Sequence, residues 1–105
     1  MPVGNGFCVD FIKAHGFSMY SGDAYTWKSY IIEDSIGWPG DAILLDEGPT
    51  EPNGIRYQHL AKILSIGNDG YNIVEQNGAG GRYVIEYRTI PFDYDRIVGF
   101  ISKPL

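Results

Sequence analysis

The sequence has one cysteine, no cluster of positive charge and no long apolar run. A single cysteine cannot form an internal disulfide, so oxidative cross-linking plays no part in the fold. No apolar stretch approaches the ~20 residues of a membrane-spanning helix, and the first residues lack the basic and apolar layout of a secretory signal. We therefore expect no membrane insertion. The chain acts in the cytoplasm, is exported by a route that the sequence does not show, or is an excised domain.

Positive charge is scarce and scattered along the chain. Eight Lys and Arg against 13 Asp and Glu give a net charge of −5. Binding to a phosphate backbone requires clustered cations, so nucleic acid is not an expected partner. One Cys and two His are too few for a zinc site. We predict no metal and no cofactor.

The composition is that of a folded domain. Apolar residues make up 44% of the chain and aromatic residues 14%, which excludes a disordered protein. A length of 105 residues suits one domain, residues 1–105, with one modest core. We expect a monomer.

Hydrophobic spacing predicts two helices followed by strands. Apolar residues at helical spacing indicate helices over 8–15 and 24–32. A continuous apolar run and partly alternating patterns then predict strands at 42–45, 60–66, 71–76, 83–90 and 97–102, with a hairpin turn at 67–70. The fold class predicted is α+β, with two N-terminal helices packed on a curled antiparallel sheet of about five strands.

Cys8 is a candidate nucleophile. Asn5 or Gly6 can cap the first helix, which places Cys8 in or near its first turn. There the free backbone N–H groups and the positive end of the helix dipole favour the thiolate. The alternative is a small buried apolar side chain, which is a common role of free cysteine.

Only two histidines could serve Cys8 as a base. His15 lies seven residues along the same helix, and a rise of about 1.5 Å per residue puts it ~10 Å away, too far for direct proton transfer. His59 begins a strand after a long loop, and the end of a rigid sheet is a good mount for a catalytic base. The alternative is an ordinary residue at the start of a strand.

Cross-strand pairing, counted from the hairpin turn, suggests a hydrogen-bond partner for His59. A turn centred on Asn68 pairs position 59 with position 77, so Asn77 would face His59 and Glu75 would be its diagonal neighbour on the same face. Either side chain could accept a hydrogen bond from the imidazole and fix its tautomer. Moving the turn by one residue moves the partner by two, so both candidates stay open. A solvated strand carboxylate and an ordinary residue at the start of a loop are the alternatives.

Five segments resemble the CHAP family, the cysteine, histidine-dependent amidohydrolases/peptidases, in order and spacing. They are Cys8-Val9-Asp10-Phe11, Pro39-Gly40-Asp41-Ala42-Ile43, His59-Leu60-Ala61-Lys62-Ile63, Ile73-Val74-Glu75-Gln76-Asn77-Gly78 and Val98-Gly99-Phe100-Ile101. The resemblance implies a papain-like core related to the NlpC/P60 enzymes. It also implies Cys8 as nucleophile, His59 as base and acid, and Glu75 with Asn77 as orienting groups.

The chain departs from the family at two positions. Many members carry Gln before the cysteine, where this chain has Phe7. If that Gln contributes to the oxyanion hole, the backbone N–H of Cys8 needs a second donor, for which Asn5 is the candidate; losing one such donor can cost ~10²–10³ in rate. Gln58 replaces the Gly that often precedes the histidine and narrows access to it.

The function that this resemblance implies is peptidoglycan hydrolysis. The protein would be a cysteine peptidase or amidase, like an endolysin, that cuts a peptide bond or the N-acetylmuramoyl-L-alanine amide. Trp27, Trp38 and the loop 46–58 are candidates for the groove wall. It would reach the wall after lysis, secretion or injection. Two alternatives stay open: an amidase acting on a small soluble γ-glutamyl or peptidyl amide, and a degenerate binder of wall peptides.

Overall fold

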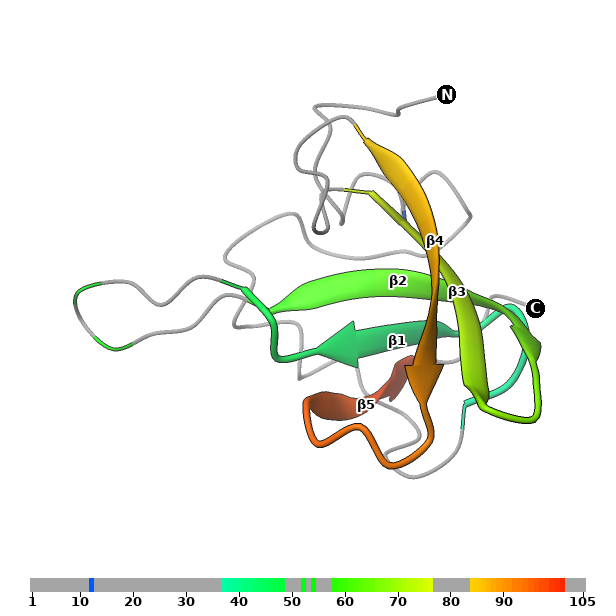
Figure 1. Ribbon diagram of the computed structural model, residues 1–105. Coiled ribbons are helices and arrows are strands. Elements are labelled where there is room, and N and C mark those ends of the chain that lie inside the picture. The colour runs from blue at the N-terminus through cyan, green and yellow to red at the C-terminus, as the bar shows by residue number, and fades with distance from the viewer. Residues whose placement is uncertain are drawn as a thin grey trace.

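The computed structural model describes residue 12 and residues 37–48, 52, 54, 58–76 and 84–101. Within them, five strands form one antiparallel sheet in the order β4-β3-β2-β1-β5 (Figure 1). The strands are β1 (Ala42–Leu45), β2 (His59–Ile66), β3 (Gly70–Gln76), β4 (Ile85–Pro91) and β5 (Ile97–Ile101). Each lies within two residues of the bounds predicted for it from the sequence.

The predicted α+β class is wrong for the described residues. These residues are all-β, with a five-stranded antiparallel sheet and no helical element, so a papain-like core with two N-terminal helices packed on the sheet is not shown. The segments 8–15 and 24–32, on which that class depended, lie outside the described residues apart from the buried Ile12. Helical spacing over a short segment is a weak basis for a fold class, because short apolar runs fit more than one structure.

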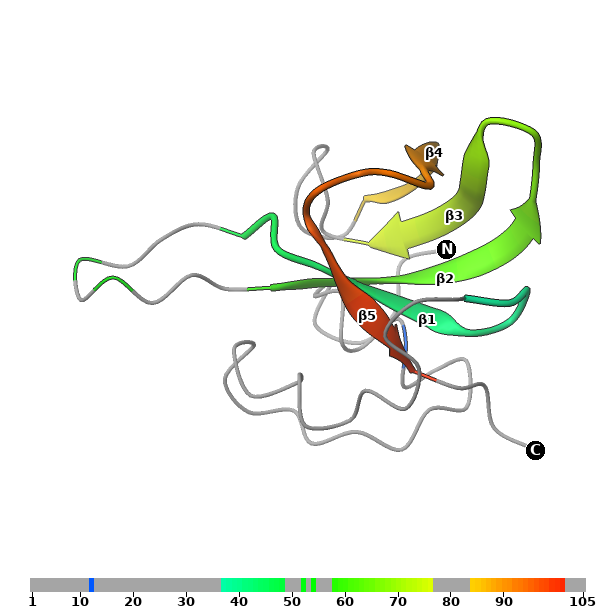
Figure 2. The ribbon, with the colours of Figure 1, turned by 90° about the horizontal axis from the view of Figure 1, so that it is seen from below.

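The sheet is strongly curled. β4 and β5 lie at opposite edges, yet only residues 92–96 connect them. Two successive turns shorten this connection, closed by hydrogen bonds from the Tyr94 amide to Pro91 and from the Ile97 amide to Tyr94. A flat sheet of five strands would hold its edges about 19 Å apart, so the short connection requires the sheet to bend. Figure 2 shows β4 and β5 curving toward each other around the central strands.

One face of the sheet buries Ala42, Leu44, Leu60, Val74 and Ile101. The other face carries an apolar cluster to which all five strands contribute. Its members are Ile43, Leu45, Ala61, Ile63, Tyr71, Ile73, Ile90 and Phe100, with Tyr94 and Ile97 packed against them. Alternation along the strands places these residues on one side because successive side chains point to opposite faces. Where β2 begins and β3 ends, the same face turns polar, with His59 and Glu75 in place of apolar residues.

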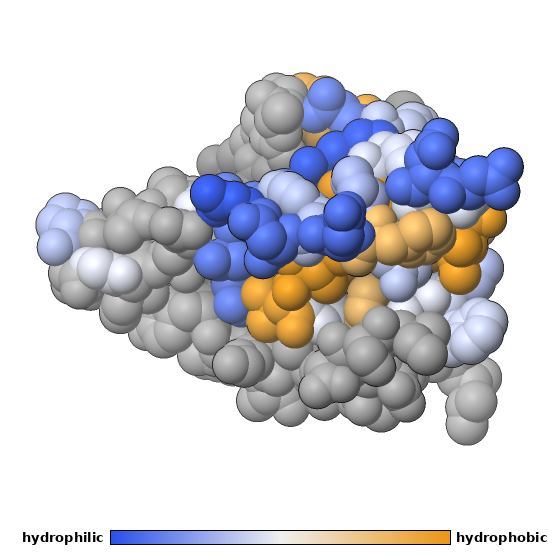
Figure 3. Space-filling model, turned by 60° about the horizontal axis from the view of Figure 1, so that its bottom comes forward, coloured by the Kyte–Doolittle hydropathy of each residue, from blue (hydrophilic) through white to orange (hydrophobic). Residues whose placement is uncertain are grey.

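The outer surface mixes apolar and polar groups. Among the described residues, the large apolar side chains exposed to solvent are Trp38, Leu64, Ile66, Val84, Tyr87 and Phe92. On the face shown in Figure 3, hydrophobic surface lies directly beside hydrophilic side chains. Within the described part of the chain, no helix is long and apolar enough to span a membrane.

Candidate active site

The centre of the polar end of the sheet is a buried pair of His59 and Glu75. Nε2 of His59 lies 2.6 Å from Oε1 of Glu75, which is a hydrogen bond between β2 and β3. His59 is 6% exposed and Glu75 is 2% exposed. Burying these two polar side chains is tolerable because each supplies the hydrogen bond that the other needs.

A β-bulge in β2 decides which β3 side chain meets His59. Near the turn, Ile66 pairs with Tyr71, but after the irregularity between Ile63 and Ser65 the register advances by one and Ala61 pairs with Glu75. Without this extra residue, Gln76 would pair with Ala61 and Glu75 would point to the other face, because a one-residue slip reverses every side chain. The bulge therefore places Glu75 on the His59 face.

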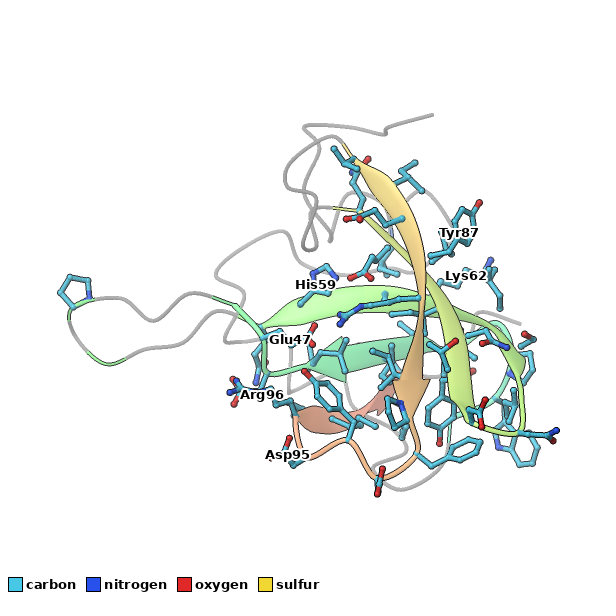
Figure 4. All side chains as sticks on the ribbon, viewed as in Figure 1. Glu47, His59, Lys62, Tyr87, Asp95 and Arg96 are labelled. Carbon is cyan, nitrogen blue, oxygen red and sulfur yellow. The ribbon has the colours of Figure 1, made fainter. Side chains whose placement is uncertain are left out.

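Arg88 extends the pair into a network of charged side chains. Its Nε donates to Oε2 of Glu75 at 2.5 Å, and its two terminal nitrogens donate to the two carboxylate oxygens of Glu47. The Tyr94 hydroxyl donates to Oε2 of Glu47. Figure 4 shows Glu47 just beyond β1, on the same side of the molecule as His59 at the start of β2. Three neighbouring strands, β2 to β4, and the segments that follow β1 and β4 thus contribute to one site.

Both carboxyl groups of the network are held ionised. Burial raises the pKa of Glu75, but hydrogen bonds from His59 and Arg88 outweigh it and bring that pKa below its usual value. Burial likewise raises the pKa of Glu47, while Arg88 and Tyr94 lower it further than burial raises it. For Tyr94, the hydrogen bond to the Glu47 carboxylate raises the phenol pKa. For Arg88, burial lowers the pKa, but the two carboxylates outweigh it and raise the pKa.

The ionised state of Glu75 fixes the protonation of the imidazole. A carboxylate only accepts hydrogen bonds, so Nε2 of His59 carries the hydrogen. In the neutral ring, Nδ1 is then the nitrogen that can take up a proton. Glu47, Glu75 and Arg88 together carry one net negative charge, which favours the positive ring that results. The arrangement is suited to a general base whose orientation and tautomer are set by an acidic partner.

The structure places some of the predicted site residues and not others. Cys8, Asn5, Trp27 and Asn77 lie outside the described residues. Trp38 is 58% exposed and precedes β1, at the end opposite to Leu45, which pairs with His59. The structure therefore brings His59 and Glu75 together but does not place Trp38 beside them.

Sequence reasoning missed three members of the network. From the sequence, Glu47 belongs to the loop 46–58 that we expect in the groove wall, and no role is predicted for Arg88 or Tyr94. The signal available for Arg88 was strand alternation: it pairs with Ile73, one diagonal step from Glu75 on the same face. Neither the register of β4 nor the curl that brings Tyr94 to Glu47 can be read from local sequence.

Gln58 directly precedes His59 in the sequence, and its side-chain oxygen lacks a hydrogen bond within the part of the chain that the structure describes. Its Oε1 atom is buried and finds no hydrogen-bond partner among the described residues. An unpaired buried carbonyl of this kind is rare in folded proteins.

For a metal ion, the described part of the chain offers no group of three or more His, Cys, Asp or Glu side chains.

No family model matches the chain, and no curated protein or solved structure is significantly similar to it. The resemblance to the CHAP family therefore stays a prediction from the sequence.

Proposed function

We propose that the protein is a cysteine-dependent hydrolase that cleaves an amide bond in peptidoglycan. The observation that carries the proposal is the buried hydrogen bond between His59 and Glu75. A histidine that is oriented by an acidic side chain is the base that a thiol nucleophile requires. The resemblance to the CHAP family supports Cys8 as that nucleophile and peptidoglycan as the substrate.

In this mechanism, His59 first activates the thiol. Nδ1 takes the proton of the Cys8 thiol, and Glu75 stabilises the imidazolium through Nε2. The thiolate attacks the amide carbonyl carbon, and backbone N–H groups, with Asn5 as a further donor, hold the oxyanion. The C–N bond breaks as the imidazolium gives its proton to the leaving amine, which produces an acyl-thioester and an amine.

Water completes the cycle. His59 takes a proton from a water molecule, and the resulting hydroxide attacks the thioester carbonyl. The C–S bond breaks, the thiolate recovers the proton from the imidazolium, and a carboxylic acid leaves. No oxidant, metal or cofactor enters this balance.

The test uses purified peptidoglycan and measures new amino groups and reducing ends. The wild-type protein should release amino groups without reducing ends, since an amide and not a glycosidic bond is cut. Cys8→Ala and His59→Ala should abolish release, and Glu75→Gln should lower kcat/KM by about 100-fold or more. Lys62 follows Ala61 in β2, so its side chain points to the face of the sheet opposite to His59. Lys62→Gln is therefore the matched control and should retain activity. Release that survives Cys8→Ala would refute the proposal.

Two further measurements separate the alternatives. Hydrolysis of small γ-glutamyl or peptidyl amides, with no action on peptidoglycan, would indicate an amidase with a soluble substrate. A rate of iodoacetamide alkylation whose pH midpoint lies near 8.5, the value of an ordinary thiol, would indicate a non-catalytic binder. The proposed hydrolase requires a midpoint well below that value.

A further inference from the structure

We infer that Arg88 is a positioning residue for the His59–Glu75 pair, and that Glu47 and Tyr94 hold Arg88 in this role. The contribution of Arg88 to catalysis rests on the proposed hydrolase function. Its contribution to the orientation of His59 rests only on the contacts of the described residues.

The Glu75 carboxylate lies between His59 and Arg88. Its Oε1 accepts the hydrogen bond from Nε2 of His59, and its Oε2 accepts the bond from Nε of Arg88. Both oxygens are therefore engaged, so the carboxylate cannot rotate about its terminal bond without breaking a charge-assisted hydrogen bond. Arg88 thereby aims Oε1 at the imidazole.

Arg88 is itself held in place by Glu47. Its guanidinium uses Nε for Glu75 and leaves both terminal nitrogens for Glu47, which accepts them with its two oxygens. This paired geometry fixes the plane of the guanidinium, which a single contact would not do. The Tyr94 hydroxyl, from the connection between β4 and β5, binds Oε2 of Glu47 and limits its movement in turn.

The contact between Arg88 and Glu75 differs from an ordinary surface ion pair. Arg88 is partly exposed, and an exposed pair would contribute little to stability. Its partner Glu75, however, is almost fully buried and is hydrogen-bonded to His59. Loss of Arg88 should therefore alter the hydrogen bond to His59, whereas loss of an ordinary surface ion pair would not.

The test follows the ring proton on Nε2 of His59 by NMR. A ring N–H that is bound to a carboxylate resonates at low field and exchanges slowly with water. The chain has only two histidines, so a His59→Ala variant identifies the signal. Wild type should show it, Arg88→Gln should accelerate its exchange at least 10-fold or remove it, and Arg88→Lys, which keeps the charge, should give an intermediate rate.

Arg96→Gln is the matched control. Arg96 is exposed and donates to the backbone oxygen of Asp46 (Figure 4), so this variant should keep the wild-type exchange rate. If Arg88→Gln fails to fold, Glu47→Gln and Arg88→Lys decide the matter, and both should exchange faster than wild type. A folded Arg88 variant with wild-type exchange overturns the inference.

Activity supplies the second readout. Arg88→Gln should lower kcat of peptidoglycan hydrolysis by about 10- to 100-fold with little change in KM, as expected for a residue that supports another. If the wild-type protein itself hydrolyses no peptidoglycan, the proposed function fails, whereas the ring-proton measurement still decides the positioning role.

Discussion

Glu75 shares its two carboxylate oxygens between His59 and Arg88, with the imidazole Nε2 on Oε1 at 2.6 Å and the guanidinium Nε on Oε2 at 2.5 Å. The hydrogen bonds of this carboxylate connect β2, β3 and β4 at the polar end of the core. A buried carboxylate in this position is a point of sensitivity for stability as well as for chemistry, because removal of either partner leaves one buried oxygen without its hydrogen bond.

The pH dependence of stability follows from the same carboxylates. The pKa values of Glu47 and Glu75 are lower in the folded protein than the usual value of 4.5. As the pH falls, the unfolded chain therefore binds more protons than the folded protein does. The stability that the two ionised carboxylates contribute is present above about pH 5 and is lost as the pH falls through the folded pKa values. Urea unfolding at a series of pH values should show this loss, and it should be smaller in Glu47→Gln. An identical pH profile in both proteins would contradict the prediction.

The glycine at the start of β3 should tolerate no side chain. Gly70 has a φ of +155°, and a Cβ added to it would lie 2.0 Å from the backbone oxygen of Ile90. Gly70→Ala should therefore lower the free energy of unfolding by several kcal/mol, or prevent folding, because the β4 backbone cannot move away without disrupting its pairing with β3. At Gly67, at the other end of the same turn, an added Cβ would lie 3.2 Å from the Asn72 side chain and 3.8 Å from the Gly70 backbone oxygen, so Gly67→Ala is far less crowded. Thermal melts of the two variants should differ clearly, and equal losses would contradict this account.

The two phenylalanines that contact Tyr71 should differ in their effect on stability. Phe100 is 2% exposed and lies in the core, whereas Phe92 is 50% exposed, although both rings approach Tyr71 at 5.1–5.3 Å between centroids. Phe100→Ala should cost about 3–5 kcal/mol because it leaves a cavity. Phe92→Ala should cost about 1 kcal/mol, from the loss of an edge-on ring contact. Chemical denaturation measures both, and a similar cost for both would place Phe92 in the core.

Gln58 offers a stabilising substitution. Methionine has a similar length and lacks the buried oxygen that finds no hydrogen-bond partner among the described residues. Because such a group costs about 1–3 kcal/mol, Gln58→Met should raise the free energy of unfolding by about 1 kcal/mol. Gln76→Met is the control, since Gln76 is fully buried and has an interaction partner, so its replacement should destabilise. A destabilised Gln58→Met would show that this oxygen is satisfied in solution.

The sheet was largely predictable because its signals are local. The run at 42–45 is apolar at every position, and in the structure it is buried at every position as β1. The turn residues 67–70 place the β2–β3 hairpin, since glycine and asparagine at this spacing favour a reversal of the chain. The helical assignment, in contrast, depended on spacing and capping residues in segments outside the described residues, which form an all-β sheet.

The candidate site was predictable only in part. Strand alternation from the turn brought His59 and Glu75 to one face, but with Asn77 as an equal candidate. Counting residues from the turn assumed a hairpin without a bulge. In the structure, Ile66 lies opposite Tyr71, and a bulge further along β2 shifts the register by one residue, so that Ala61 lies opposite Glu75. The bulge arises from the pairing of two strands, and no single residue type in the sequence predicts it.

The sequence by itself determined the strands and the hairpin, because alternation and turn residues act over a few neighbouring positions. It also determined that one histidine begins a strand of that hairpin. Only the tertiary structure decided that Arg88 and Glu47 join His59 and Glu75. These contacts depend on register across four strands and on the curl of the sheet, and both result from packing between segments far apart in the chain.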